Sequence, residues 1–382
     1  MKKQLTVILL AALLFTLFTG RTTPCFADER IQTDGRASFL CEYKTGRVLS
    51  EFNADRKYPI ASMVKIMTLD LIFDAIADGK LHYDDQICVS SNAASMGGSQ
   101  AFLDEGAVYK AETLVKSIII ASANDSCVAL AETISGSTEA FVDAMNRKAD
   151  SLGMKNTNFV NCTGLPAEGG YSSARDVSVM MRDLLSHKDY FRYSRIWMED
   201  LVHPSGRVTG LTNTNRLVRF YDGCDGGKTG YTSEAGHCLC ATAIKGGMRL
   251  ISVIVGGSDS KTRFDSSAKL LNYGFANYES KLMLGTDSTA AEIKVAQGKK
   301  DVVAAGTERN LYLFGERGRN KGEIRFELPE SVKAPVKKGD VIGKALVVDS
   351  NGNTVDESNI IALETIEKLS FWEIIKGIVT GR

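Results

Sequence analysis

The sequence predicts an α/β (α+β) domain with a central antiparallel sheet, followed by a small all-β domain. Two observations predict the first domain: β-rich runs occur at 36–52 and again at 226–257, and the patterns between them are helical. Strands joined by short turns pair in an antiparallel manner, so one sheet should join both ends of the domain. Short alternating runs and turn motifs such as "KKGD" and "SNGN" after residue 281 predict the second domain.

The elements of the first domain follow in order along the chain. "RASFLCEY" and "RVLSEF" predict a hairpin around the turn "KTG". "PIASMVKIMTLDLIF" at 59–73 predicts the start of a helix that ends near Asp78-Gly79. "SARD" is a capping-box pattern that places Ser173 at the N-cap of a further helix. The remaining helices are predicted at 111–134, with an interruption at "ASAN", at 138–152 and at 262–276.

The two ends of the chain carry specialised segments. Lys2 and Lys3, an apolar run and the small residue Ala27 predict an export signal that is cleaved after Ala27. Cys25 offers lipidation as an alternative, although Thr23 and Pro24 suit it poorly. The tail predicts an amphipathic helix that either lies in a membrane interface or docks on its own domain. The expected division is a signal peptide at 1–27, a catalytic domain at 28–280, a β-rich domain at 281–362 and an anchoring helix at 363–382.

Composition limits the possible classes of function. The 382 residues carry no net formal charge, which gives no indication of a nucleic-acid partner. Seven of the eight cysteines follow Ala27, and their scattered, odd-numbered arrangement predicts buried thiols rather than a disulfide framework. His237, Cys238 and Cys240 could suggest a metal site, but the alternation in "HCLCATA" favours a strand. We therefore expect neither a metal nor a cofactor.

The motif S-x-x-K could place a serine nucleophile beside a lysine base, but the pattern alone is weak. It occurs three times: as Ser62 with Lys65, Ser258 with Lys261, and Ser266 with Lys269. S-x-N occurs at 90–92 and 122–124, and K-T-G occurs at 44–46 and 228–230. Order and context are therefore needed to choose among the copies.

Context favours the pair Ser62 and Lys65. It follows a proline and opens a long apolar helix, and residues three apart share one helix face. A serine in the first turn also lies near unpaired N–H groups that suit an oxyanion. Ser122-Ala123-Asn124 interrupts a helix, where a loop would direct polar groups into a cleft. The later K-T-G opens a β run, and its glycine leaves room for a ligand beside the strand.

The ordered set S-x-x-K, S-x-N and K-T-G resembles the penicillin-recognising serine enzymes, whose fold is β-lactamase/transpeptidase-like. Longer phrases resemble one branch, the serine-type D-alanyl-D-alanine carboxypeptidases of the peptidase S11-like, low-molecular-mass penicillin-binding group. These phrases are "YPIASMVKIMT", "IIASANDSCVALAE", "NFVNCTGLP", "YSSARDVSVMMRDLL", "DGGKTGYTSEAGHCLCATA" and "APVKKGDVIGKALV". The resemblance extends over nearly the whole chain that follows the signal, including the β-rich domain and the tail.

The resemblance implies a role for each matching residue. Ser62 would be the acylated nucleophile, Lys65 its base, and Ser122 the relay that passes a proton to the leaving D-alanine. The N–H groups of Ser62 and Tyr231 would form the oxyanion hole. The implied catalytic residues are Ser62, Lys65 and Ser122, and the implied substrate-binding residues are Asn124, Lys228, Thr229, Gly230 and Tyr231.

The resemblance also implies the partners and the location. The substrate would be a peptidoglycan stem peptide that ends in D-Ala-D-Ala, and β-lactams would be covalent inhibitors. The protein would act in cell-wall maturation at the outer face of the cytoplasmic membrane, in contact with the membrane surface through its C-terminal helix.

Two features depart from the family pattern. The family's arginine before K-T-G has two candidates here, Arg216 and Arg219, and His237 stands where an aromatic residue is expected. Three alternatives share the motifs: a β-lactamase, a non-catalytic penicillin sensor and a DD-endopeptidase. A β-lactamase would be expected to carry an "E-x-x-L-N" motif between the second and third motifs. The chain has only Glu168, in "LPAEGG", in that stretch.

Overall fold

The structure is a computed structural model that describes residues 31–373 and 375. The export signal expected at 1–27 therefore lies outside the described residues, as do most of the last nine residues of the tail.

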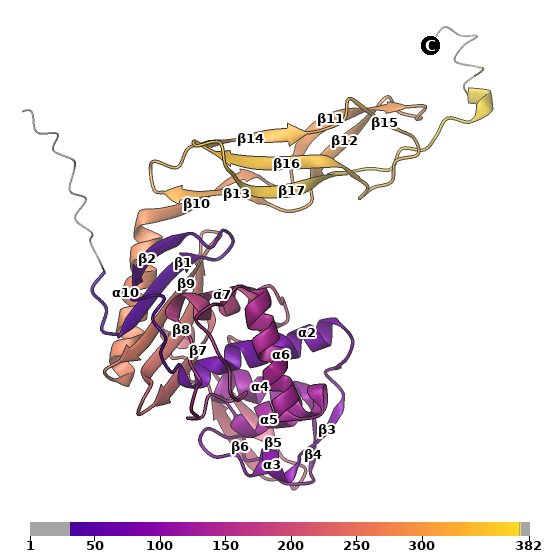
Figure 1. Ribbon diagram of the computed structural model, residues 1–382. Coiled ribbons are helices and arrows are strands. Elements are labelled where there is room, and N and C mark those ends of the chain that lie inside the picture. Colours follow the sequence, from indigo (N-terminus) through magenta and orange to yellow (C-terminus); the bar gives the residue numbers. More distant parts are fainter. Residues whose placement is uncertain (1–30, 374, 376–382) are drawn as a thin grey trace, which may run out of the picture. The chain divides into compact units, whose positions relative to one another are not determined.

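A five-stranded antiparallel sheet organises the first domain, in the order β2-β1-β9-β8-β7 (Figure 1). The N-terminal hairpin joins the later strands through the pairing of β1 with β9, as the sequence predicted. Among the residues that the structure describes, strand β7 pairs with β8 alone, so its other edge has no strand partner. The strands are β1 (Ala37–Glu42), β2 (Val48–Phe52), β7 (Cys224–Thr232), β8 (Gly236–Lys245) and β9 (Met248–Gly257).

Helix α2 forms the centre of the helical part of this domain. Nine of its 13 residues are buried, and it contacts α4, α5, α6 and α7. Helices α7 and α10 both pack on the sheet (Figure 1). The helices are η1 (Ala61–Val64), α2 (Lys65–Ala77), α3 (Ser91–Ala94), α4 (Ala111–Ala121), α5 (Asn124–Ser135), α6 (Thr138–Ser151), α7 (Ala174–Leu184), α8 (Tyr190–Tyr193), α9 (Leu217–Phe220) and α10 (Ser260–Asn277).

Local signals in the sequence account for several helix boundaries. The Ser173 side chain accepts a hydrogen bond from the Asp176 N–H at 3.1 Å, which confirms the predicted cap of α7. The helical segment predicted over 111–134 divides into α4 and α5, and Ser122 occupies the left-handed region at the end of α4. Two small hairpins were not predicted: β3 (Gln86–Cys88) with β4 (Val108–Lys110), and β5 (Met198–Val202) with β6 (Val208–Thr212).

The second domain is all-β, as predicted. A six-stranded sheet has the order β14-β16-β17-β12-β11-β15, and β10 pairs with β13. Its own core contains Val303, Leu311, Val347 and Ile360, all of which are fully buried. The strands are β10 (Tyr278–Leu284), β11 (Thr289–Ala296), β12 (Val302–Thr307), β13 (Leu311–Glu316), β14 (Gly322–Glu327), β15 (Ser331–Lys333), β16 (Val341–Asp349) and β17 (Thr354–Ala362).

The tail departs from the helix predicted for 363–382. Residues 363–370 are not helical, because Ile366 and Lys368 form β-bridges with Val336 and Gly298. Ile366 is buried in the core of the β-rich domain, so its place in the apolar pattern reflects docking. Helical structure begins only at residue 371, and residues 374 and 376–382 lie outside the described part of the chain.

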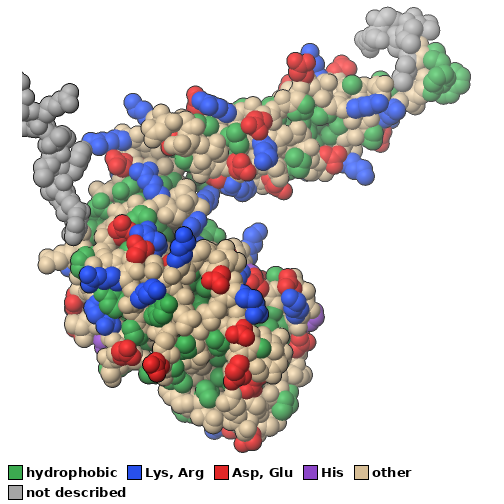
Figure 2. Space-filling view, in the orientation of Figure 1, with side chains coloured by type: hydrophobic (Ala, Val, Ile, Leu, Met, Phe, Trp, Pro, Cys, Tyr) green, Lys and Arg blue, Asp and Glu red, His purple; other side chains and the backbone are tan. Residues whose placement is uncertain are grey.

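The surface shows no concentration of one charge on the face in Figure 2, where basic and acidic side chains are interspersed. Among the described residues, no helix is both long enough and apolar enough to cross a membrane.

Candidate active site

Ser62 and Lys65 meet at the start of the central helix. The Nζ of Lys65 lies 2.9 Å from the Oγ of Ser62 and 2.5 Å from the carbonyl oxygen of Thr163. Ser62 lies in the 3₁₀ turn η1, and α2 begins only at Lys65, whereas the sequence predicted one continuous helix. The two side chains still share one face, because a separation of three residues is close to one turn in either helix type.

The turn that carries Ser62 is tightly enclosed by two glycines. Ala61, the preceding residue, has a φ of +48°, which is uncommon for a residue with a side chain. A Cβ on Gly230 would lie 2.9 Å from the Ser62 nitrogen, and one on Gly164 would lie 2.1 Å from the Ala61 oxygen. Only glycine allows the two flanking segments to approach this closely, so both segments hold the backbone N–H of Ser62 in place.

Lys65 and Lys228 are both buried, and burial changes their acid–base behaviour. Burial lowers the pKa of Lys65, and the nearby thiols of Cys127 and Cys162 oppose that shift only in part. Burial, and then the positive charge of Lys65, hold the pKa of Lys228 well below its ordinary value. Two neighbouring buried ammonium groups are unfavourable, so the arrangement disfavours a positive charge on both amines at once.

Ser122 and Asn124 present polar atoms that have no partner. Ser122 has a φ of +65°, and its Oγ is buried without a hydrogen bond among the described residues. The Oδ1 of Asn124 is likewise buried and unpartnered, while its Nδ2 donates to the Gly97 oxygen at 2.7 Å. Asp125 accepts hydrogen bonds from the N–H groups of Ala101 and Leu103 and so fixes the neighbouring loop. Buried polar atoms of this kind are costly unless a ligand satisfies them.

The K-T-G segment lies on strand β7, which borders the turn of Ser62. The Thr229 hydroxyl donates to the Thr214 Oγ1 at 2.8 Å, and the Gly230 oxygen accepts a hydrogen bond from Arg263. Tyr231 is 58% exposed, and its ring stacks on His237 at 4.3 Å between centroids. His237 thus occupies the place of the expected aromatic residue as a stacking partner.

The two arginine candidates differ in their surroundings. Burial lowers the pKa of Arg263, and the charge of Arg216 adds to this shift. The Arg263 guanidinium donates to the carbonyl oxygen of Gly230. Arg219 lies over the Trp197 ring, 5.4 Å from its centroid. Arg216 is therefore the candidate whose charge acts on a group that contacts the K-T-G segment.

The other motif copies have ordinary structural roles. Ser90 caps α3 by accepting a hydrogen bond from the Ala93 N–H, and Ser266 accepts one from the Asp34 N–H. Lys44 and Thr45 form the predicted turn, in which the Glu42 carboxylate accepts hydrogen bonds from both N–H groups. Lys261 pairs with Asp265 on the surface of α10.

Comparison with known proteins identifies the family. A profile described as D-alanyl-D-alanine carboxypeptidase, peptidase S11, matches residues 25–259. The chain belongs to this family. A second profile, the C-terminal domain of penicillin-binding protein 5, matches residues 278–368.

Individual relatives match the S11 chain over most of its length. It is 38% identical to D-alanyl-D-alanine carboxypeptidase DacF of Bacillus subtilis, over 98% of this chain and 97% of the relative. It is 34% identical to DacC of Escherichia coli, over 93% and 91% of the two chains. The crystal structure of penicillin-binding protein 5 from Haemophilus influenzae superposes with a TM-score of 0.67 and 31% identity, over 88% of this chain and 98% of that one.

Membership of the S11 carboxypeptidase family confirms the predicted fold and enzyme class: a serine peptidase with a penicillin-recognising α/β domain and an all-β second domain. The individual roles of Ser62, Lys65, Ser122 and the five substrate-binding residues remain predictions. The seven cysteines of the described residues are free thiols, and all except Cys88 are buried. Within residues 31–373 and 375 no cluster of histidine, cysteine or acidic side chains could hold a metal ion.

The sequence did not predict that the loop containing Thr163 accepts a hydrogen bond from Lys65 in this S11 site. The carbonyl oxygen of Thr163 accepts a hydrogen bond from Lys65, and Asn161 shapes the loop around it. The Asn161 Oδ1 accepts from the N–H groups of Thr163 and Gly164, and its Nδ2 donates to the Leu165 oxygen. The phrase "NFVNCTGLP" contains this loop, but no motif rule assigned a function to its asparagine.

Proposed function

We propose that the protein is a DD-carboxypeptidase that removes the terminal D-alanine from peptidoglycan stem peptides through an acyl-enzyme on Ser62. The observation that carries the proposal is the 2.9 Å contact between the Ser62 Oγ and the Nζ of the buried Lys65. With Lys65 neutral, the serine hydroxyl can donate its proton to the lone pair of the amine across this contact.

Acylation would use the groups on both sides of Ser62. Lys65 takes the hydroxyl proton while the Oγ attacks the carbonyl carbon of the penultimate D-alanine. The N–H groups of Ser62 and Tyr231 stabilise the oxyanion, a contribution of about 10²–10³ in rate for each donor. As the carbon–nitrogen bond breaks, Ser122 delivers a proton to the amine of the departing D-alanine, and Lys228 maintains that proton path.

Substrate recognition would use Asn124 and Thr229. The free Oδ1 of Asn124 accepts a hydrogen bond from a substrate amide, and the Thr229 hydroxyl binds the terminal carboxylate. Gly230 allows the peptide to lie against the free edge of β7. Water then attacks the acyl-enzyme carbonyl, Lys65 accepts a proton from that water, and Ser62 is regenerated as the shortened peptide leaves.

β-Lactams would acylate the same serine. Their amide nitrogen is part of a ring, so it stays attached to the acyl group after the carbon–nitrogen bond breaks. It therefore remains in the path of the hydrolytic water, whereas D-alanine diffuses away. This predicts a covalent adduct that persists longer than the peptidyl-enzyme.

Release of D-alanine from a pentapeptide that ends in D-Ala-D-Ala tests the proposed function. We expect release by the purified protein and none by Ser62→Ala. A cross-linked muropeptide dimer is the second substrate, because faster cleavage of that dimer would identify a DD-endopeptidase instead. Absence of release by the unmutated protein, alongside normal penicillin labelling, would contradict the carboxypeptidase proposal.

We further propose that the protein is exported and associates peripherally with the outer face of the cytoplasmic membrane. Support comes from the tail, where Phe371 and Trp372 are 70% and 77% exposed, and Figure 2 shows hydrophobic side chains grouped beside the last residues. Exposed aromatic residues of this kind suit a membrane interface.

Vesicle co-sedimentation of a chain that ends at Ser370 tests the anchor, because this truncation retains the docked residue Ile366. We expect binding to fall sharply. Phe326→Ala, which removes an exposed aromatic residue of the β-rich domain, is the control and should bind normally. Unchanged sedimentation of the truncated chain would contradict the proposal.

A further inference from the structure

The peptide group that joins Thr163 to Gly164 contacts Lys65 on one side and an asparagine on the other. Its carbonyl oxygen, which belongs to Thr163, accepts a hydrogen bond from the Nζ of Lys65 at 2.5 Å. Its N–H, which belongs to Gly164, donates to the Oδ1 of Asn161 at 2.6 Å. The C=O and N–H bonds of a trans peptide point in opposite directions, so the two side chains hold one peptide plane from opposite edges. The orientation of this plane therefore decides whether Lys65 meets an acceptor or a donor.

The backbone does not fix that orientation by itself. Gly164 has a φ of +78°, and glycine adopts positive and negative values of φ about equally. Type I and type II turns differ by a rotation of about 180° of their central peptide, and a glycine that follows this peptide permits both. In the rotated form, the N–H of Gly164 would face Lys65 in place of the Thr163 oxygen.

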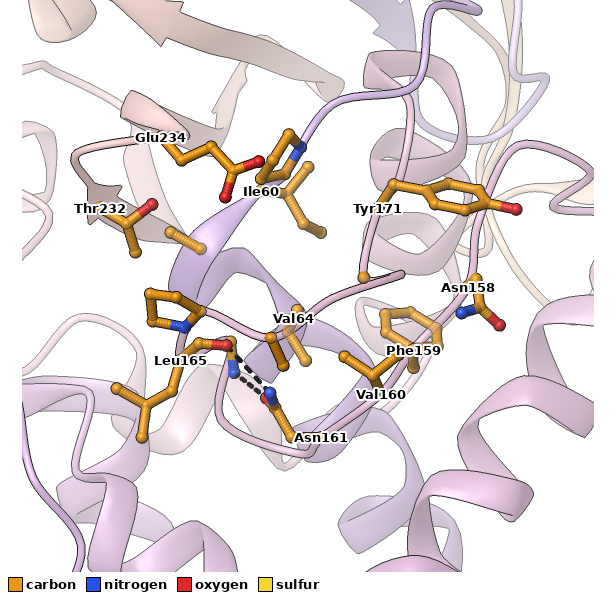
Figure 3. Close-up of a pocket in the computed structure, with 16 residues that line it drawn as sticks. Ile60, Val64, Asn158, Phe159, Val160, Asn161, Leu165, Tyr171, Thr232 and Glu234 are labelled. Carbon is orange, nitrogen blue, oxygen red and sulfur yellow. Dashed lines mark hydrogen bonds between the residues drawn. The ribbon is translucent and has the colours of Figure 1, made fainter.

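Asn161 supplies the contacts that favour the observed orientation. Its Oδ1 also accepts hydrogen bonds from the N–H and the hydroxyl of Thr163, at 3.1 and 3.2 Å, and its Nδ2 donates to the Leu165 oxygen at 2.9 Å. Figure 3 shows the Asn161 side chain directed towards the backbone at Leu165, where dashed lines mark hydrogen bonds. Within residues 31–373 and 375, this Oδ1 is the only hydrogen-bond acceptor of the Gly164 N–H.

We propose that Asn161 is a positioning residue that holds the carbonyl oxygen of Thr163 on Lys65. Held in this way, the amine of Lys65 directs its lone pair towards Ser62. A rotated peptide would instead donate its N–H to that lone pair and withdraw it from the serine proton. Asn161 makes no hydrogen bond to Ser62 or Lys65 in the described part of the chain, so it acts through the peptide group. This inference rests on the proposed function, because it takes Lys65 as the base.

The other charged surroundings of Lys65 stay constant when Asn161 is replaced. The ionisable groups that act on Lys65 are Cys127 and Asp125 of α5, Cys162 of the loop and Lys228 of β7. A change in the titration of Lys65 on loss of the Asn161 side chain therefore reports its contact with the peptide group.

The pH dependence of penicillin acylation tests this role. Asn161→Ala removes the acceptor of the Gly164 N–H, so the plateau rate constant should fall at least about ten-fold, which corresponds to one hydrogen bond. The midpoint should also move about one pH unit lower, because the protonated amine loses an acceptor that favours its charged form. A purely structural role for Asn161 would leave this midpoint in place.

Asn161→Asp is the conservative variant. Its carboxylate can still accept hydrogen bonds from the N–H groups of Thr163 and Gly164, and only the bond to Leu165 is lost. We expect a plateau within about three-fold of the unmutated value. The midpoint should move to higher pH, because the added negative charge favours the protonated lysine. Equal plateaus in Asn161→Ala and Asn161→Asp would overturn the proposal, whether both are lost or both are retained.

Asn146→Ala is the matched control, because Asn146 fixes the start of the same loop. Its side chain makes two hydrogen bonds with the backbone of Phe159, both at 2.8 Å. This variant should lower thermal stability about as much as Asn161→Ala and leave the plateau and the midpoint unchanged. An equal loss of acylation in this control would show a general loosening of the loop and overturn the assignment. If Asn161→Ala does not fold, a plateau of Asn161→Asp at least about ten-fold below the unmutated value would overturn the proposal.

If the unmutated protein takes up no penicillin, the proposed function fails, and the titration of Lys65 then decides the inference separately. NMR of the full chain with ¹³C-labelled lysine Cε follows this titration, and the Lys65 signal is assigned by its absence from Lys65→Arg. Asn161→Ala should titrate at lower pH than the unmutated protein. Equal midpoints would overturn the role of Asn161.

Discussion

The Nζ of Lys65 lies between the Oγ of Ser62, at 2.9 Å, and the carbonyl oxygen of Thr163, at 2.5 Å. The carbonyl can accept one N–H of a neutral amine, which directs the lone pair towards Ser62. Burial lowers the pKa of Lys65, and burial together with the charge of Lys65 holds the pKa of the second lysine, Lys228, well below its ordinary value. One contact thus orients the Lys65 amine, and its burial favours the neutral form.

Acylation should depend on pH through Lys65. Because the protonated amine cannot accept the serine proton, the rate constant for penicillin acylation should rise with pH through the pKa of Lys65. Burial lowers that pKa, so the plateau should begin below the ordinary lysine value of about 10.4. In Lys65→Arg the guanidinium stays protonated and cannot accept the serine proton. This variant should therefore lose about 10²–10⁴ in the rate of acylation. Stopped-flow acylation of both proteins checks this, and a flat profile for the unmutated protein would exclude Lys65 as the base.

Gly164 should be intolerant of a side chain because of its contact with the Ser62 turn. Gly164→Ala brings a Cβ to 2.1 Å from the Ala61 oxygen, at a φ of +78°. The control Gly153→Ala has a φ of +73° and no atom within 4 Å of its Cβ. Both variants should lose roughly 1–3 kcal/mol of stability from backbone strain. Only Gly164→Ala should also lose acylation, by at least about ten-fold, and equal acylation by the two variants would contradict the account.

Replacement of Arg216 and replacement of Arg219 should have different effects on kcat/KM. The charge of Arg216 acts on Arg263, which donates to Gly230, whereas Arg219 lies over the Trp197 ring. We expect Arg216→Ala to lower kcat/KM for a D-Ala-D-Ala peptide about ten-fold, which corresponds to one charge-assisted hydrogen bond. Arg219→Ala should leave kcat/KM within about two-fold of the unmutated value. If Arg219→Ala caused the larger loss instead, the contact with the terminal carboxylate of the substrate would be assigned to Arg219.

Lys148 should contribute to stability rather than to catalysis. Its Nζ lies 2.7 Å from carboxylate oxygens of both Asp74 and Asp183 and 3.6 Å from the fully buried Asp70. Lys148→Met should therefore lower the free energy of unfolding by roughly 2–4 kcal/mol, near the lower end for a broken buried pair. The double variant Lys148→Met/Asp70→Asn should recover part of that loss.

The pH dependence of the Lys148 variant has a definite sign. Burial raises the pKa of Asp70 to about 6, so this carboxyl binds its proton more tightly in the folded state than in the unfolded state. Its ionisation therefore lowers stability as pH rises from about 4 through 6. Without the Lys148 charge this effect should grow, so the deficit of Lys148→Met should be larger at pH 8 than at pH 5. Denaturant unfolding at both pH values measures it, and an equal deficit would contradict the assignment.

The sequence predicted the parts of the site that motif order and local context define. Ser62 and Lys65 share a helix face by their spacing, Ser122 interrupts a helix, and the K-T-G segment lies on a strand. Each of these features depends on neighbours within a few residues. Thr163 could not be assigned in this way, because its carbonyl reaches Lys65 across 98 positions of sequence.

The tail shows the limit of a periodic pattern. Leu363, Ile366 and Leu369 recur at helical spacing, which predicted a helix from residue 363. Ile366 instead pairs with Val336 as a β-bridge, because the neighbouring domain offers a backbone partner and an apolar site. The hydrophobic spacing correctly indicated that Ile366 is buried. It did not show that a β-bridge, rather than a helix, places this residue in the core.

Location of the penicillin adduct by mass spectrometry is the most direct test of the central assignment, acylation at Ser62. Trypsin should release residues 58–65, "YPIASMVK", in which Ser62 is the sole serine. The account predicts one adduct per chain, carried by this peptide and absent from Ser62→Ala. An adduct on the peptide that contains Ser122, or on those with Ser258 or Ser266, would contradict the account.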